Sequence, residues 1–171
     1  DRNRLQHTVY QVLLGESTVA EAVIASGSGF DVLPAEPGLA GAQAELTQGG
    51  ESDNHRLRQA LDTVQHYDLM LIDSPPALNV LTLNALVAAQ SVLIPVQCEY
   101  YALEGLSGLD DTIRRLQASI NPGLTIEGLI RTMFDARNSL TNEVSVQLQH
   151  YYPNLVYKAV IPRNVRLAEA P

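Results

Sequence analysis

Apolar residues recur along this chain in short continuous runs, and segments with helical spacing separate the runs. Runs of this length, bounded by charged residues, proline or glycine, predict strands. The runs at 68–73 and 91–97 are continuously apolar rather than alternating, which is typical of strands buried on both faces of a parallel sheet. We predict strands at 30–34, 68–73, 91–97, 126–134 and 156–162.

The segments between these runs have the periodicity of helices. From Leu57 to Val64, for example, apolar residues fall every three or four positions and share one helix face. The last predicted helix begins near Thr141 or Asn142, either of which is a suitable cap. We predict helices at 57–64, 78–89, 103–120 and 141–151.

Strands that alternate with helices predict an α/β fold. The expected architecture is a doubly wound, mostly parallel sheet with helices on both faces and right-handed crossovers. An α+β fold with a mixed sheet is the alternative. No internal repeat or linker divides the sequence, so we expect residues 1–171 to form a single domain.

Composition and charge narrow the possible functions. The chain has 171 residues, of which 46% are hydrophobic, and this is enough apolar material for a core. Eleven Lys and Arg against nineteen Asp and Glu give a net charge of -8. That balance excludes nucleic-acid binding through bulk positive charge but leaves room for a local basic patch. Without a membrane-spanning run or paired cysteines, we expect a soluble, cytoplasmic domain.

The first candidate site follows the predicted strand at 68–73. Its last residue, Asp73, places a carboxylate at the carboxyl edge of the sheet, where α/β folds bind ligands. Such an acid can hold Mg²⁺ or its water shell in nucleotide hydrolases. The next residues, Ser74, Pro75 and Pro76, predict a stiff loop, because two prolines restrict the backbone. A structural turn or cap is the alternative for this motif.

Two further loops, at 133–138 and 161–166, place arginine and asparagine just beyond a strand end. Asparagine can read a base edge, and a flat guanidinium can cover the face of a base. Arginines at these positions could also contact phosphate oxygens. Solvated loop arginines are the alternative.

These motifs together resemble the ParA/Soj partition ATPases, relatives of MinD with a deviant Walker motif. The resemblance covers essentially the whole chain in order. Its most specific part is the sequence VIPRNVRLAEAP at 160–171. The other matching segments are 8–15, 33–35, 67–76, 81–89, 91–105 and 132–137.

The resemblance implies a cytoplasmic, nucleoid-associated ATPase for chromosome or plasmid partitioning. Such proteins use ATP and Mg²⁺, form a nucleotide-bound homodimer, bind double-stranded DNA nonspecifically without a membrane, and respond to a ParB-type centromere-binding partner. Asp73 matches the Walker B acid, with catalytic and Mg²⁺-binding roles, and the loop at 74–76 matches the switch loop. The residues expected around adenine are Met133, Pro162, Arg163 and Asn164, and those expected on DNA are Arg137 and Arg166.

The chain departs from the family pattern at the phosphate-binding loop. That glycine- and lysine-rich turn and its strand should precede Asp1, and no glycine-rich stretch within the chain has a lysine to replace it. We therefore expect an incomplete ATPase domain, also lacking its C-terminal end, that is inactive on its own. A noncatalytic DNA- or protein-binding remnant is one alternative. A MinD-like membrane-surface ATPase is the other, although the segment at 160–171 favours the DNA-segregation branch.

Overall fold

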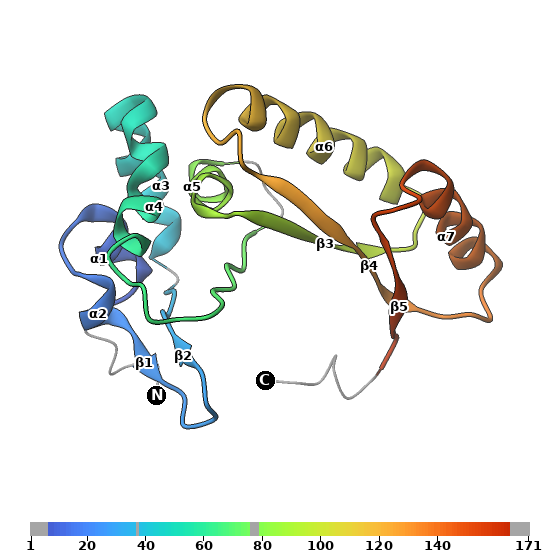
Figure 1. The fold of residues 1–171 in the computed structure, drawn as a ribbon, viewed down its shortest axis with the longest axis horizontal. Helices are drawn as coiled ribbons and strands as arrows, with labels where there is room; N and C mark the ends of the chain where they lie inside the picture. Colours follow the sequence, from blue (N-terminus) through green and yellow to red (C-terminus); the bar gives the residue numbers. More distant parts are fainter. Residues whose placement is uncertain (1–6, 37, 76–78, 165–171) are drawn as a thin grey trace. The chain divides into compact units, whose positions relative to one another are not determined.

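The structure, a computed structural model, describes residues 7–36, 38–75 and 79–164, and the chain divides into two compact units, Asp1–Ala89 and Gln90–Pro171. The colours of Figure 1 follow the sequence, from blue at the N-terminus to red at the C-terminus. None of the described helices is long and apolar enough to cross a membrane. The first unit contains α1 (Val9–Leu14), α2 (Val19–Ala22), β1 (Ile24–Ala25), β2 (Asp31–Val32), α3 (Leu39–Leu46), the 3₁₀ segment η2 (Thr47–His55), α4 (Arg56–Leu61) and α5 (Val80–Ala88). The second contains β3 (Ser91–Gln97), α6 (Ala102–Ser119), β4 (Thr125–Phe134), α7 (Ser139–Tyr151) and β5 (Val156–Pro162).

The short helices of the first unit begin at side-chain caps. Thr8 and Gln11 form a capping box on α1, in which the Thr8 N–H donates to Gln11 Oε1 at 2.9 Å. Thr18 and Glu21 form the equivalent pair on α2, with the Thr18 N–H donating to Glu21 Oε2 at 2.9 Å. Helices this short need such caps, because most of their N–H groups have no partner inside the helix.

Asn84 on α5 connects this helix to η2 and α4 through a buried side-chain amide. Its side chain is 1% exposed. Its Oδ1 accepts from the Leu57 N–H at 3.1 Å, and its Nδ2 donates to the Asp53 carbonyl at 2.9 Å. One buried amide thus satisfies backbone groups where η2 meets α4, which a purely apolar side chain could not do. Apolar clusters surround this network, built on Val12, Val19, Ala22 and Val64 and on Leu13, Leu46 and Leu57.

The second unit is a parallel sheet in the order β3-β4-β5, with α6 and α7 as its crossovers (Figure 1). Because the strands follow one another in order, crossovers of the usual right hand place both helices on one face of the sheet. The two helices contact each other. Buried apolar side chains come from both layers, namely Ile94, Val96, Leu106, Ile113, Leu116, Leu129, Val144 and Leu148.

The register between β4 and β5 shifts on either side of Arg131, and the Arg131 side chain binds backbone carbonyls of β5 at this place. Leu129 pairs with Val156 and Arg131 with Val160, so β5 has extra residues between these two pairs. The guanidinium of Arg131, a residue only 6% exposed, donates to the carbonyls of Tyr157 at 2.8 Å and Lys158 at 3.2 Å. Those carbonyls lie on the bulged segment of β5. A third bond, to Ser145 Oγ at 2.7 Å, connects the same side chain to α7.

The structure confirms the α/β class and the parallel sheet, and it corrects several boundaries. The predicted strand at 91–97 is β3, and the predicted helix at 103–120 is α6 with a shift of one residue. The helix predicted from Thr141 begins instead at Ser139, because Asn138 accepts from the N–H groups of Leu140 and Thr141 and is the cap. The helix predicted to reach residue 64 ends at Leu61, and the strand predicted at 30–34 has only the two residues of β2.

The predicted strand at 68–73 is wrong. In the described residues these positions have no ladder partner, and the segment runs as extended coil. A strand exists only through hydrogen bonds to a neighbour, so an apolar run alone does not create one. Its side chains are consequently exposed, Leu69 by 74% and Leu71 by 86%.

A substitution at Gly128 in β4 tests the packing between β4 and β5. A methyl group at this position would lie 2.5 Å from Tyr157 Cε2 and 2.9 Å from the Leu155 carbonyl oxygen. We expect Gly128→Ala to lower the free energy of unfolding by about 1–3 kcal/mol through overpacking. The control is Gly108→Ala in α6, where no atom lies within 4 Å of the added methyl and helix propensity predicts a gain of up to about 1 kcal/mol. Equal effects in urea unfolding would contradict this account.

Arg131→Met is expected to lower the free energy of unfolding by about 1–3 kcal/mol, because the Tyr157 and Lys158 carbonyls lose their donor. Methionine keeps the apolar stem, so the measured loss reports the guanidinium. Hydrogen exchange should rise in β5 more than in β3. A variant as stable as the parent would show that water replaces the guanidinium without loss.

Candidate functional site

The carboxyl ends of β4 and β5 meet at one edge of the sheet. Phe134 is the register partner of Pro162, and the Arg163 N–H donates to the Phe134 carbonyl at 3.2 Å. The structure thereby brings Met133, Pro162 and Arg163 together at one edge of the sheet, and their role around a nucleotide base stays a prediction. Ligands of parallel α/β sheets bind at this edge.

Met133 has an unusual backbone at this edge. Its φ is 51°, and no other non-glycine residue in the described ranges has a positive φ. Between Arg131 and Phe134 the register shifts again, so Met133 lies on a bulge of β4. The side chain is 40% exposed. A left-handed methionine is strained, and such strain is found most often where a protein positions a side chain for a ligand.

Asn164 is the remaining residue expected around the base, and it is exposed just beyond β5, as is Arg163. Together with Pro162 and Met133 they offer two apolar groups, a guanidinium and an amide. This set fits a purine, whose faces stack on flat or apolar groups and whose edge needs a donor and an acceptor.

Arg137 is paired with Asp135 two residues before it. Arg137 Nε donates to Asp135 Oδ1 at 2.9 Å, and Arg137 Nη2 donates to Oδ2 at 2.8 Å, so the pair is bidentate. The Arg137 side chain is 90% exposed. Hydrogen bonds from Arg137 are the main cause that lowers the pKa of Asp135 to about 2, and the charge of Arg163 contributes to this shift. The carboxylate in turn raises the pKa of Arg137.

The loop that carries this pair is held by asparagines. Asn138 caps α7, accepting at Oδ1 from the Leu140 N–H at 3.0 Å. Asn142 Nδ2 donates to the Ala136 carbonyl at 2.8 Å and to the Asn138 carbonyl at 2.9 Å. The backbone between β4 and α7 is therefore fixed, although the Arg137 side chain extends into solvent.

Beyond β3, the third strand end of this edge, two tyrosines are exposed. The Tyr100 and Tyr101 rings meet edge to face, with centroids 5.0 Å apart, and are 75% and 71% exposed. Cys98 beside them is buried, and burial raises the pKa of its thiol. A protonated, buried thiol is a poor nucleophile, so Cys98 has a packing role.

Asp73 belongs to the first unit, whereas the residues expected around the base belong to the second. It ends the extended segment and is exposed, as are Ser74 and Pro75. The Pro75 carbonyl accepts from the Thr82 hydroxyl at 3.4 Å, which connects this loop to α5. Pro76 and Arg166 lie outside the described residues.

The chemistry of Asp73 suits magnesium bound through a nucleotide. Among the described residues, no group of three or more His, Cys, Asp or Glu side chains could hold a metal ion. Mg²⁺ does not need such a group, since it keeps several waters and takes one or two carboxylates together with substrate phosphates. A single exposed carboxylate fits that role.

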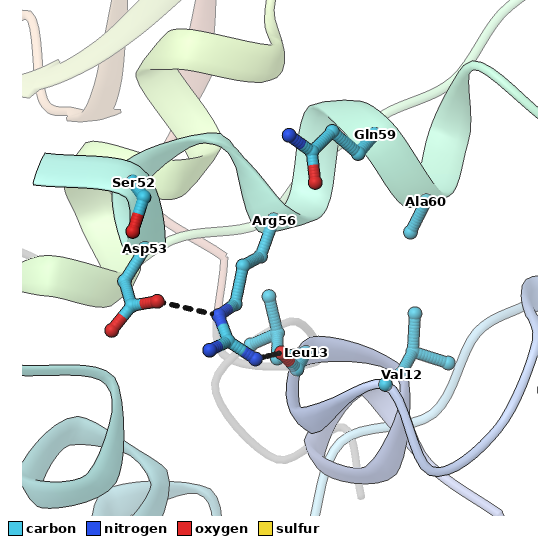
Figure 2. Close-up of a pocket in the computed structure, with 8 residues that line it drawn as sticks. Val12, Leu13, Ser52, Asp53, Arg56, Gln59 and Ala60 are labelled. Atoms are coloured by element: carbon cyan, nitrogen blue, oxygen red, sulfur yellow. Dashed lines mark hydrogen bonds and ion pairs between the residues drawn. The ribbon is translucent and has the colours of Figure 1, made fainter. Parts of the chain in front are cut away.

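The first unit also has an open hollow beside Asp53 and Arg56 (Figure 2). Arg56 extends from α4 between η2 and α1, pairing at Nε with Asp53 Oδ1 at 2.8 Å and donating from Nη1 to the Leu13 carbonyl at 3.1 Å. The Leu13 carbonyl belongs to the last turn of α1, where a cation satisfies orphan acceptors. Arg56 therefore stabilises the packing of these helices.

Sequence reasoning missed two residues of the candidate site. Asp135 was not predicted, although an acid two positions before Arg137 in a turn is the signal that could have found it. The Phe134 carbonyl accepts from the Arg163 N–H. The sequence contains no signal for this bond, because a backbone hydrogen bond depends on strand register and not on residue type.

A protein-family model described as "AAA domain" matches residues 1–126. The chain is 48% identical over 169 residues to the sporulation initiation inhibitor protein Soj of Bacillus subtilis, covering 98% of this chain and 66% of Soj. It is 46% identical over 174 residues to the chromosome partitioning protein ParA of Caulobacter vibrioides, covering 99% of this chain and 65% of ParA. The chain thus spans about two thirds of the length of these relatives.

The fold is also similar to a solved enzyme with a bound nucleotide. The structure of cobyrinic acid a,c-diamide synthase from Mycobacterium smegmatis, with an ATP analogue and magnesium, superposes with a TM-score of 0.87 at 35% identity. The match covers 96% of this chain and 68% of that enzyme. Fold, matched model and sequence relatives agree: the chain belongs to the AAA-domain family that includes the ParA and Soj partition ATPases.

Proposed function

We propose that the protein carrying this chain hydrolyses ATP to partition chromosomes or plasmids. The observation that supports this most is the meeting of Met133 with Pro162 and Arg163 at the carboxyl edge of β4 and β5. It occurs in a chain that is 46% and 48% identical to the partition proteins ParA and Soj over almost its whole length.

In this proposal residues of each unit have their own task. Met133, Pro162, Arg163 and Asn164 enclose the adenine, and Asp73 holds Mg²⁺ through its water shell. Ser74, Pro75 and Pro76 form the switch loop that follows the metal-binding acid. Magnesium would supply charge neutralisation on the phosphates, while the chain's own residues orient the base and anchor the metal's water.

DNA binding is assigned to Arg137 and Arg166. The chain has a net charge of -8, so DNA affinity must come from a few arginines gathered on one face rather than from bulk charge. A nucleotide-dependent homodimer would double the number of such arginines on the DNA. The proposed partner is a ParB-type centromere-binding protein, and the proposed location is the nucleoid in the cytoplasm.

Asp73→Ala in the natural full-length protein is expected to lower ATP hydrolysis by about 100-fold or more, because the metal and its water lose their anchor. Asp68→Ala is the matched control, since Asp68 is an exposed acid at the other end of the same extended segment. Hydrolysis should be measured at saturating ATP and Mg²⁺. Turnover that survives Asp73→Ala, or no turnover in the parent, would favour a noncatalytic binding module.

Arg137→Ala is expected to weaken binding to all double-stranded DNA sequences alike. If Arg137 neutralises one DNA phosphate in each subunit, the slope of log affinity against log salt should flatten by about 0.9 for each phosphate that the variant leaves unneutralised. Arg115→Ala on α6 is the matched control, because Arg115 is also exposed. A salt titration with both variants at saturating ATP measures the difference. An unchanged slope for Arg137→Ala would show that this residue does not bind DNA phosphate.

A further inference from the structure

The Arg137 side chain, which is 90% exposed, makes its described hydrogen bonds to a single carboxylate. Its Nε and Nη2 groups point along one edge of the guanidinium and both bind Asp135, at 2.9 Å and 2.8 Å. A guanidinium can form a bidentate pair of hydrogen bonds to a phosphate with the same two donors. The Asp135 carboxylate therefore occupies a place that a phosphate group could take.

We propose that Asp135 is an intramolecular stand-in for phosphate, which competes with the DNA backbone for Arg137 and keeps nonspecific DNA affinity low. The inference rests on the proposed DNA contact of Arg137 and specifies how that contact is regulated. DNA that binds displaces the Asp135 carboxylate from Arg137. When the DNA leaves, the carboxylate binds Arg137 again.

Asp135 is well placed to compete, because its carboxylate has an anchor that does not depend on the Arg137 side chain. The Arg137 backbone N–H donates to Asp135 Oδ1 at 3.0 Å, which anchors the carboxylate in its own turn. Asn142 fixes the following carbonyl, that of Ala136, at 2.8 Å. Asp135 is ionised at neutral pH both when Arg137 lowers its pKa to about 2 and when Arg137 has moved away, because an ordinary aspartate is also ionised there. The turn thus presents a permanent negative charge.

The pair is easily opened. An exposed ion pair competes with water and salt, so it holds its side chains weakly. A DNA phosphate can therefore take Arg137 from Asp135 without disturbing the fold.

The geometry favours competition over a positioning role for Asp135. The edge formed by Nε and Nη2 is already taken by the carboxylate. A phosphate bound at the other edge, through Nη1, would still lie close to a negative charge that repels it. On either edge, the acid lowers the affinity of Arg137 for phosphate.

The experiment compares six forms of the natural full-length protein at saturating ATP: the parent, Asp135→Asn, Asp135→Ser, Arg137→Ala, the double variant Asp135→Asn with Arg137→Ala, and Glu143→Gln. Glu143 is an exposed acid on α7, so Glu143→Gln removes the same charge from a neighbouring position. Asparagine keeps an acceptor for the Arg137 N–H, and Asp135→Ser is a second variant that also keeps one. Fluorescence anisotropy with a labelled duplex of arbitrary sequence gives the affinity at several salt concentrations.

We expect Asp135→Asn to tighten DNA binding by about two- to fivefold per subunit, and Glu143→Gln to tighten it less. In the Arg137→Ala background, Asp135→Asn should have no more effect than Glu143→Gln. Equal effects of Asp135→Asn and Glu143→Gln in the parent would overturn competition, and so would weaker binding by Asp135→Asn, which would indicate a positioning role. If Arg137→Ala alone leaves affinity unchanged, the proposed DNA contact itself fails, and this outcome is distinct from failure of competition.

Discussion

The guanidinium of Arg131 is the interaction on which the site of the second unit depends. The β4–β5 ladder is bulged just before the strand ends that carry Met133 and Pro162. A bulge leaves carbonyl groups without ladder partners, and unpaired carbonyls let two strands slide or separate. Arg131 binds the Tyr157 and Lys158 carbonyls and also Ser145 on α7, so strand, strand and helix are fixed by one side chain. The register of Phe134 opposite Pro162 follows from that attachment.

A buried cation bound to neutral acceptors is unusual, because burial of a charge normally requires an opposite charge. Here the side chain donates to two carbonyls and a hydroxyl, and it lies 5.7 Å from the centre of the Phe134 ring. Arginine can be accommodated in this way because its charge is delocalised and weakly hydrated. Lysine, a compact and strongly hydrated point charge, could not span the same three acceptors.

Much of the fold could be predicted from the sequence wherever local pattern decides the outcome. The continuous apolar run at 91–97 coincides with β3, and the amphipathic stretch after Leu103 belongs to α6. The prediction failed at 68–73, because a strand also needs a partner and its own residues do not provide one. The grouping of Met133, Pro162 and Arg163 followed from the resemblance. The left-handed backbone of Met133 and the pairing of Asp135 with Arg137 depend on bulge and turn geometry, which residue types alone do not determine.

The exposed apolar run from Leu69 to Ile72 has a consequence for how the chain behaves before it binds anything. Short, β-prone, uncharged segments of this kind nucleate intermolecular association when they lie open to solvent. Here an acid stands at each end, Asp68 before the run and Asp73 after it. Charges in such flanking positions act as gatekeepers, because stacking identical copies would bring like charges together. The negative charge of the Asp73 carboxylate thus disfavours the stacking of this run in neighbouring molecules.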